Sequence, residues 1–272
     1  MSTIQITIAT GDPAIIGILI ATLSESGFEG FEEKEEILLA YIPEEKWQPR
    51  VLQQFLAAHS LEYSIEKLEE KNWNEEWEKN FQPVRVNTFC GVRAYFHEPQ
   101  EGVLHEVIIT PKMSFGTGHH ATTHMMIEAM QQVDFGHRSV LDFGTGTGVL
   151  AILAEKLGAA EITAIDNDTW CIANALENVA ENQAKKVSVK KMDSLDSVDR
   201  FDIILANINK NVILKELPTM TQHLAEAGVI LVSGVLQEDY GDIEEAASGH
   251  QFLITRKLTR ANWICLQLEE RR

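Results

Sequence analysis

The most chemically informative part of the sequence is a glycine-rich segment flanked by carboxylates. Asp142 is followed by Gly144, Gly146 and Gly148, and Asp166 lies 22 residues after the first of these glycines. Glycines lack a Cβ atom, so the main chain can turn sharply there and approach a bound ligand. A carboxylate at the end of the next strand can accept hydrogen bonds from both hydroxyls of a ribose. The pattern predicts a site for a ribose-containing cofactor.

The spacing favours S-adenosylmethionine over a dinucleotide. Dinucleotide sites usually read G-x-G-x-x-G and place a pyrophosphate at a helix N-terminus, whereas this loop reads G-x-G-x-G. The Asp142 carboxylate would repel a pyrophosphate but would attract the sulfonium and ammonium charges of S-adenosylmethionine. We therefore predict that Asp142, Gly144, Gly146 and Asp166 bind this cofactor. A glycine-rich turn that only connects a strand to a helix is the alternative.

Composition restricts the class of protein further. The chain of 272 residues is long enough for a large domain plus a small one. Its longest apolar run, residues 14–23, is too short to span a membrane, and no basic region precedes it as in a signal peptide. We expect a cytoplasmic protein without a membrane partner. Cys90, Cys171 and Cys265 are widely separated, so we expect reduced thiols and no metal site.

The charge of the chain bears on its partners. A net charge of −18 argues against direct binding to nucleic acid, because there is no basic surplus to release counterions. Positions 1–80 hold 16 acidic and 6 basic residues. Such a surface could attract a strongly basic protein over long range, although an acidic balance that serves solubility alone is equally expected.

The N-terminal part predicts a small α+β domain. Its order is β-α-β-β-α-β, which is typical of a ferredoxin-like unit, with elements expected at residues 3–9, 13–27, 28–31, 37–42, 44–59 and 61–68. We assign residues 1–70 to substrate recognition, since no cluster there looks catalytic; a purely structural appendage is the alternative. Residues 71–80 predict a helical linker whose Trp73 and Trp77 share one face.

Residues 81–272 predict the cofactor-binding domain. After a strand-rich segment at 84–109, strands and helices alternate, which indicates an α/β fold with a doubly wound, mainly parallel Rossmann-like sheet. Seven strands are expected, the last two forming a closing hairpin with an antiparallel strand, at residues 140–143, 162–166, 187–192, 201–206, 229–233, 251–258 and 263–268. Helices are expected up to residue 157, over 169–181 and around 212–224.

Two further segments make the interpretation specific. Phe115–Thr123 reads F-G-T-G-x-H-x-T-T, and the strand Phe201–Asn207 ends in an amide. Together with the Asp142–Gly148 loop, they resemble the PrmA family of ribosomal protein methyltransferases over essentially the whole chain. The resemblance implies methyl transfer from S-adenosylmethionine to lysine or N-terminal amines of the eleventh large-subunit ribosomal protein. It also implies that the N-terminal domain docks that protein.

Family roles transfer only at matching positions. Thr123 matches a cofactor contact at the start of a helix, while Gly144 and Asp166 match the loop and ribose contacts. Asn207 matches the amide at the end of the fourth strand, which makes it a cofactor contact and the expected catalytic residue. The sequence departs from the common family pattern at Ala121, Thr145 and Thr147. None of these differences removes a hydrogen-bonding group that we assign to the cofactor.

Four polar residues near these motifs have two interpretations each. Asp193 follows the strand at 187–192 and could accept from the adenine amine, or it could be an ordinary turn residue. His119, His120 and His124 invite a metal interpretation, but no carboxylate or cysteine lies at ligand spacing. We therefore expect polar turn and helix-cap residues there and no metal.

The expected chemistry requires little more than alignment. An in-line methyl transfer needs a neutral amine held against the sulfonium methyl in a dry pocket. The Asn207 side-chain carbonyl, with a neighbouring backbone carbonyl, could accept the amine N–H groups; a strand-end turn residue is the alternative. A lysine amine must first lose a proton, at a cost of roughly 4–5 kcal/mol at neutral pH. No general base is evident in the sequence.

Other functions remain open at this stage. The enzyme could methylate another protein or a small amine, or the fold could serve as a non-catalytic binding module. Methylation of glutamine is disfavoured, because the relatives that perform it carry Asn-Pro-Pro-Tyr where this chain has Asn207-Ile-Asn-Lys210. We expect a monomer, although the sequence does not determine the oligomeric state, nor which amines are modified.

Overall fold

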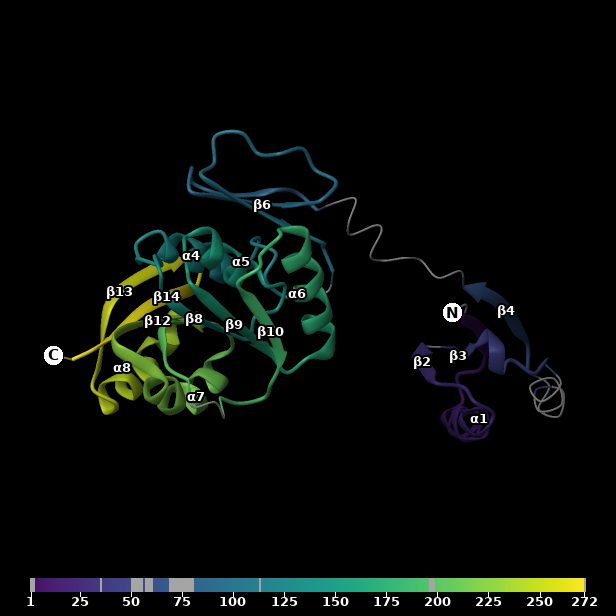
Figure 1. The fold of residues 1–272 in the computed structure, drawn as a ribbon. Coiled ribbons are helices and arrows are strands. Elements are labelled where there is room, and N and C mark those ends of the chain that lie inside the picture. Colours follow the sequence, from purple (N-terminus) through teal and green to yellow (C-terminus); the bar gives the residue numbers. More distant parts are fainter. Residues whose placement is uncertain are drawn as a thin grey trace. The chain divides into compact units, whose positions relative to one another are not determined.

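The computed structural model describes residues 3–34, 36–49, 56, 61–68, 81–112, 114–195 and 199–271. The chain divides into two compact units, Met1–Trp73 and Asn74–Arg272, called here the N-terminal and C-terminal units (Figure 1). The expected linker at 71–80, with Trp73 and Trp77, lies outside the described residues. The linker and the domain limits set from the sequence therefore stay predictions.

The N-terminal unit is an antiparallel sheet backed by a helix. Its strand order is β2-β3-β1-β4, with β1 paired to both β3 and β4. Asp12 begins the helix, because its carboxylate accepts the Ala14 N–H at 2.9 Å. Most of the second helix, expected over 44–59, lies outside the described residues, and Glu44–Lys46 form a 3-10 turn. The elements are β1 (Thr3–Ala9), α1 (Pro13–Glu25), β2 (Gly30–Lys34), β3 (Ile37–Pro43) and β4 (Tyr63–Leu68).

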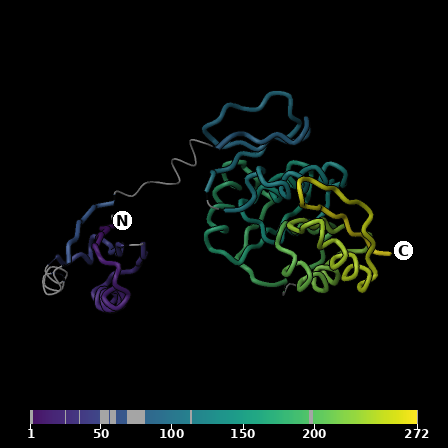
Figure 2. The backbone as a smooth tube through the Cα atoms, turned by 180° about the vertical axis from the view of Figure 1, so that it is seen from behind, coloured from purple at the N-terminus to yellow at the C-terminus, as the bar shows by residue number. Residues whose placement is uncertain are grey.

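The C-terminal unit is built on a seven-stranded sheet of order β10-β9-β8-β11-β12-β14-β13. The five strands from β10 to β12 are parallel, and β14 is antiparallel to both of its neighbours. Figure 2 shows the hairpin of β13 and β14 in yellow. The expected doubly wound sheet with a closing hairpin is confirmed. Its strands are β8 (Ser139–Phe143), β9 (Glu161–Asp166), β10 (Val187–Lys191), β11 (Phe201–Asn207), β12 (Leu224–Leu236), β13 (Phe252–Arg260) and β14 (Trp263–Glu270).

Helices cover both faces of this sheet (Figures 1 and 2). On β11, Ile203 and Leu205 join one buried apolar cluster, whereas Ile204 and Ala206 join the other. Successive side chains of a strand point to opposite faces, so a strand covered on both sides is apolar throughout. The first cluster includes residues of α4 (Ala121–Met130) and α5 (Val149–Lys156), and α6 (Thr169–Glu181) lies on the same side of the sheet. The second cluster includes residues of α7 (Lys210–Gln222) and α8 (Tyr240–Gly249).

The helix α8 has no counterpart among the sequence predictions. It buries Ile243 and Ala247, which lie four residues apart, and glycines stand at positions 241 and 249. Two buried positions are too few to produce a visible helical period. Packing of these two side chains against the sheet selects the helix, which is a tertiary effect.

A three-stranded sheet precedes the main sheet in the chain. Its strands are β5 (Val84–Val86), β6 (Cys90–Ala94) and β7 (His105–Ile109), with β6 antiparallel to β5 and parallel to β7. The chain continues from β7 into residues 110–120, which lead to α4. No helix in the described part of the chain is long and apolar enough to cross a membrane.

Candidate active site

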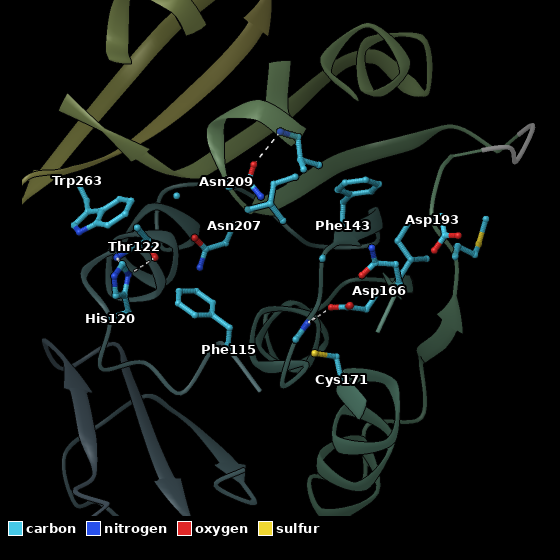
Figure 3. A pocket seen from close by; sticks show the side chains of 18 residues that line it. Phe115, His120, Thr122, Phe143, Asp166, Cys171, Asp193, Asn207, Asn209 and Trp263 are labelled. Carbon is cyan, nitrogen blue, oxygen red and sulfur yellow. Dashed lines mark hydrogen bonds between the residues drawn. The ribbon is translucent and has the colours of Figure 1, made fainter. Parts of the chain in front are cut away.

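A pocket of about 460 Å³ lies beside the ends of the central strands. The order of the sheet reverses between β8 and β11, and in open α/β sheets ligands bind where the order reverses. The pocket has two chemically different ends (Figure 3). Asp166, Cys171 and Asp193 form the end called here the polar end, and Phe115, His120 and Trp263 form the aromatic end.

Gly144 and Gly146 line the pocket in left-handed conformations, with φ of 75° and 54°. A Cβ atom at Gly144 would overlap the Ile208 side chain, and one at Gly146 would overlap the Phe115 carbonyl oxygen. Left-handed backbone already favours glycine. These glycines are therefore required by neighbouring protein segments as well as by any ligand.

Asp142 is fully buried beneath this loop and is not among the residues that line the pocket. Its Oδ2 accepts from the Thr145 hydroxyl at 2.6 Å and from the Ala151 N–H at 3.2 Å. Burial raises the pKa of the Asp142 carboxyl to about 6, with a smaller contribution from the nearby Asp166 charge. This carboxylate joins the glycine-rich loop to the start of α5. The contact between Asp142 and the cofactor that the sequence predicted stays a prediction.

Asp166 ends β9 and lines the polar end of the pocket. Its Oδ2 accepts from the Gly146 N–H at 2.9 Å, and its Oδ1 accepts from the Asp168 N–H at 3.0 Å. A carboxylate oxygen can accept more than one hydrogen bond. Asp166 can therefore hold the glycine loop and still accept hydroxyl groups of a ligand.

Asn207 and Thr123 are brought together from β11 and α4. The Asn207 Nδ2 donates to the Thr123 hydroxyl over 3.2 Å, and Asn207 lines the pocket (Figure 3). Its Oδ1 is buried and has no hydrogen-bond partner among the described residues. Thr123 is fully buried behind Asn207 and is not one of the pocket-lining residues. A buried acceptor without a partner is costly, which is consistent with a ligand donor at this position.

The aromatic end was not predicted. The His120 ring packs edge-on between Phe115 and Trp263, at centroid distances of 5.2 and 4.9 Å. His120 also precedes the first residue of α4, with Nδ1 lying 2.8 Å from the Thr122 hydroxyl. Phe115 and His120 belong to the F-G-T-G-x-H-x-T-T motif, so the sequence carried a signal for them. Trp263 lies far from this motif in the sequence, and no local pattern marks it as a pocket residue.

The remaining predicted positions are placed as follows. Asp193 lines the polar end, which leaves both of its interpretations open. Burial lowers the pKa of His119 and of His124, and no group of three or more possible metal ligands occurs in the described part of the chain. Burial raises the pKa of the Cys90 and Cys265 thiols to about 12.

The pocket fits S-adenosylmethionine chemically. Phe143, Ile165 and Met192 supply apolar surface beside the Asp166 carboxylate, as the base and ribose of a nucleoside require. The Asn207 Oδ1, which no described residue contacts by a hydrogen bond, offers an acceptor toward the other end of the pocket. Pockets of 300–1,000 Å³ are usual for ligands of this size.

Comparison with known proteins identifies the class first: the fold is that of a Rossmann-like methyltransferase. The structure superposes with a TM-score of 0.66 on the crystal structure of ribosomal protein L11 methylase from Lactobacillus delbrueckii subsp. bulgaricus, at 28% identity, covering 71% of this chain and 100% of that one. The M. jannaschii tRNA m1G37 methyltransferase shares the fold alone, with a TM-score of 0.51 and 12% identity over 99% of each chain.

The family follows from sequence. The model of the family described as ribosomal protein L11 methyltransferase (PrmA) matches residues 21–271. The proteins of that name from Porphyromonas gingivalis and Phocaeicola vulgatus are 42% and 38% identical, covering 92% of this chain and 89% and 92% of theirs. The chain belongs to the PrmA family. It is a methyltransferase with S-adenosylmethionine as methyl donor, as the resemblance implied.

Proposed function

We propose that this enzyme transfers methyl groups from S-adenosylmethionine to amino groups of ribosomal protein L11. The names of its relatives support this substrate. The observation that carries the chemistry is the buried Oδ1 of the pocket-lining Asn207, which has no hydrogen-bond partner among the described residues. Methylation of another protein or of a small amine is the alternative.

The polar end is proposed to hold the nucleoside part of the cofactor. Asp166 accepts the ribose hydroxyls, while Phe143, Ile165 and Met192 contact the base. Gly144 and Gly146 form the wall between the nucleoside and Asn207. When bound, the cofactor supplies an electrophilic methyl group on a cationic sulfur.

Asn207 is proposed to align the amine of the substrate. Its Nδ2 is held by the Thr123 hydroxyl, so the amide cannot turn freely and its Oδ1 keeps one direction. That oxygen accepts an N–H of the neutral amine, which directs the nitrogen lone pair at the methyl group. The rings of Phe115 and Trp263 keep water away from the same space.

The N-terminal unit is proposed to bind L11 through its acidic surface. Its described lysines, Lys34, Lys46 and Lys67, each pair with a glutamate of the same unit. These lysines therefore present no separate basic patch that would repel a basic ribosomal protein. A ribosomal substrate also favours the cytoplasm as the location of the enzyme.

The test uses labelled S-adenosylmethionine and a mixture of unmodified ribosomal proteins, with the label located by mass spectrometry. Wild-type enzyme is expected to label L11. Asn207→Ala is expected to lower kcat by about 10²–10³-fold, because alignment is lost, while its Kd for S-adenosylhomocysteine, measured by calorimetry, changes less than about threefold. Label on another protein would contradict the substrate, and full activity of Asn207→Ala would contradict the role of this residue.

A further inference from the structure

Two segments that form the pocket are joined through Thr147. The first is the loop of residues 114–118, called the motif loop, and the second is the glycine loop, residues 142–148. The Thr147 N–H donates to the Phe115 carbonyl at 2.9 Å, and its hydroxyl donates to the Gly116 carbonyl at 2.8 Å. Thr147 is fully buried. The position of Phe115 against Gly146 therefore depends on where Thr147 lies.

Asn178 of α6 holds Thr147 by its backbone carbonyl, which is not one of the groups that contact the motif loop. Its Nδ2 donates to the Thr147 carbonyl at 2.8 Å, and its Oδ1 accepts from the Thr110 N–H at 2.7 Å. One partner is an acceptor and the other a donor, so the orientation of the amide is fixed by its surroundings. The side chain is fully buried and both of its ends are hydrogen-bonded.

The same helix offers a matched control. Asn182, the residue that follows the end of α6, bonds in the same way to the N–H and the carbonyl of Ile108 in β7. Asn178 is buried and Asn182 is half-buried. Asn182 bonds to Ile108 in β7, and Asn178 bonds to Thr110, which directly follows that strand. Among the described residues, Asn178 bonds to the glycine loop and Asn182 does not.

We infer that Asn178 is a positioning residue for the cofactor pocket and acts through Thr147. It sets the separation of the glycine loop from Phe115 and Gly116, and so the shape of the wall against which the cofactor binds. The contacts form a continuous chain from α6 to the pocket: Asn178, Thr147, then the motif loop. The inference rests on the proposed cofactor site.

The test compares Asn178→Ala with Asn182→Ala in the full-length protein. Binding of S-adenosylhomocysteine is measured by calorimetry, and thermal unfolding and the KM for L11 are measured alongside. Both variants are expected to lower Tm, because each removes a side-chain amide that is hydrogen-bonded to a distant segment of the chain. Asn178→Ala alone is expected to raise the Kd for S-adenosylhomocysteine, by about tenfold for the lost hydrogen bond, with the KM for L11 unchanged.

Thr147 provides a second, independent variant if Asn178→Ala does not fold. Thr147→Val removes the hydroxyl bonded to Gly116 and is expected to weaken binding of S-adenosylhomocysteine severalfold. Thr147→Ser keeps the hydroxyl and is expected to bind within about twofold of wild type. In the double variant with Asn178→Ala, the two effects should be less than additive, since both act on the same contact.

Three outcomes are distinguished. If the wild-type protein does not bind S-adenosylhomocysteine, the proposed cofactor site itself is wrong. If it binds, but Asn178→Ala and Asn182→Ala shift Kd equally, Asn178 has only a structural role and the inference is overturned. Equal affinities of Thr147→Val and Thr147→Ser would overturn it as well.

Discussion

The polar and aromatic ends of the pocket are assembled in different ways. The polar end comes from consecutive elements, since Asp166 ends β9, Cys171 lies in the first turn of α6 and Asp193 follows β10. Each side chain stands at the end of a strand or the start of a helix. In a parallel sheet, such positions meet at one edge without any contribution from distant segments.

The aromatic end, with Asn207 beside it, needs three distant segments of the chain. Phe115 and His120 of the aromatic end precede α4, and its Trp263 begins the last strand, while Asn207 ends β11. Trp263 reaches the pocket because β14 returns antiparallel beside β12. We infer that the two ends have different tasks: the polar end binds the cofactor, and the aromatic end and Asn207 receive the substrate amine.

The largest expected effect concerns Asp142, beneath the polar end. Burial raises its pKa to about 6, above the ordinary value of an aspartate carboxyl. Between these two values the native state holds a proton that the unfolded state has lost. The associated stability is present below about pH 4 and is lost as the pH rises through 6. Relative to Asp142→Asn, the free energy of unfolding of wild type should fall by about 3 kcal/mol between pH 4 and 7.

Urea unfolding of the two proteins at pH 4, 5.5 and 7 measures this difference. The comparison between variants cancels the titration of other carboxyl groups, such as Asp202, whose pKa is lowered by its contacts with Ser139 and Arg138. A difference that does not change with pH would show that Asp142 is ionised normally in the folded protein.

An intermediate effect is expected for Asp166→Asn. Loss of the charged acceptor should raise the Kd for S-adenosylhomocysteine by roughly thirtyfold, about 2 kcal/mol, and leave the KM for L11 unchanged. Calorimetry and steady-state kinetics measure the two quantities. Asp168→Asn removes the same charge two residues away, outside the pocket lining, and should leave the Kd near that of wild type.

The smallest effect is expected for Trp263→Leu at the aromatic end. Here the KM for L11 should rise about tenfold, the equivalent of about 1.4 kcal/mol of lost aromatic contact, while the Kd for S-adenosylhomocysteine stays within about threefold. Trp170→Leu is the control, since Trp170 is 56% exposed and is not one of the pocket-lining residues. If Trp263→Leu weakened cofactor binding and not the KM, the division between the two ends would be wrong.

The fold was predictable where periodicity is strong. The helix at Thr169–Glu181 and the strand at Thr3–Ala9 have the limits expected from sequence, because apolar residues repeat at helical or alternating spacing. The helix α8, with two buried positions, was missed.

At the site, the pocket lining includes four of the predicted residues: Gly144, Gly146, Asp166 and Asn207. Two others, Thr123 and Asp142, are buried and do not line the pocket. Sequence spacing does not reveal on which side of a loop a short side chain lies.

The sequence by itself determined the class of cofactor and the order of the elements that carry the loop, because both depend on residues that are neighbours in the chain. The tertiary structure alone decided that the Asp142 carboxylate supports the loop from beneath and that Trp263 completes the pocket. It also decided that Asn178 bonds to Thr147. These contacts join residues that have no fixed spacing in sequence, and they exist only once helices and strands have packed into one core.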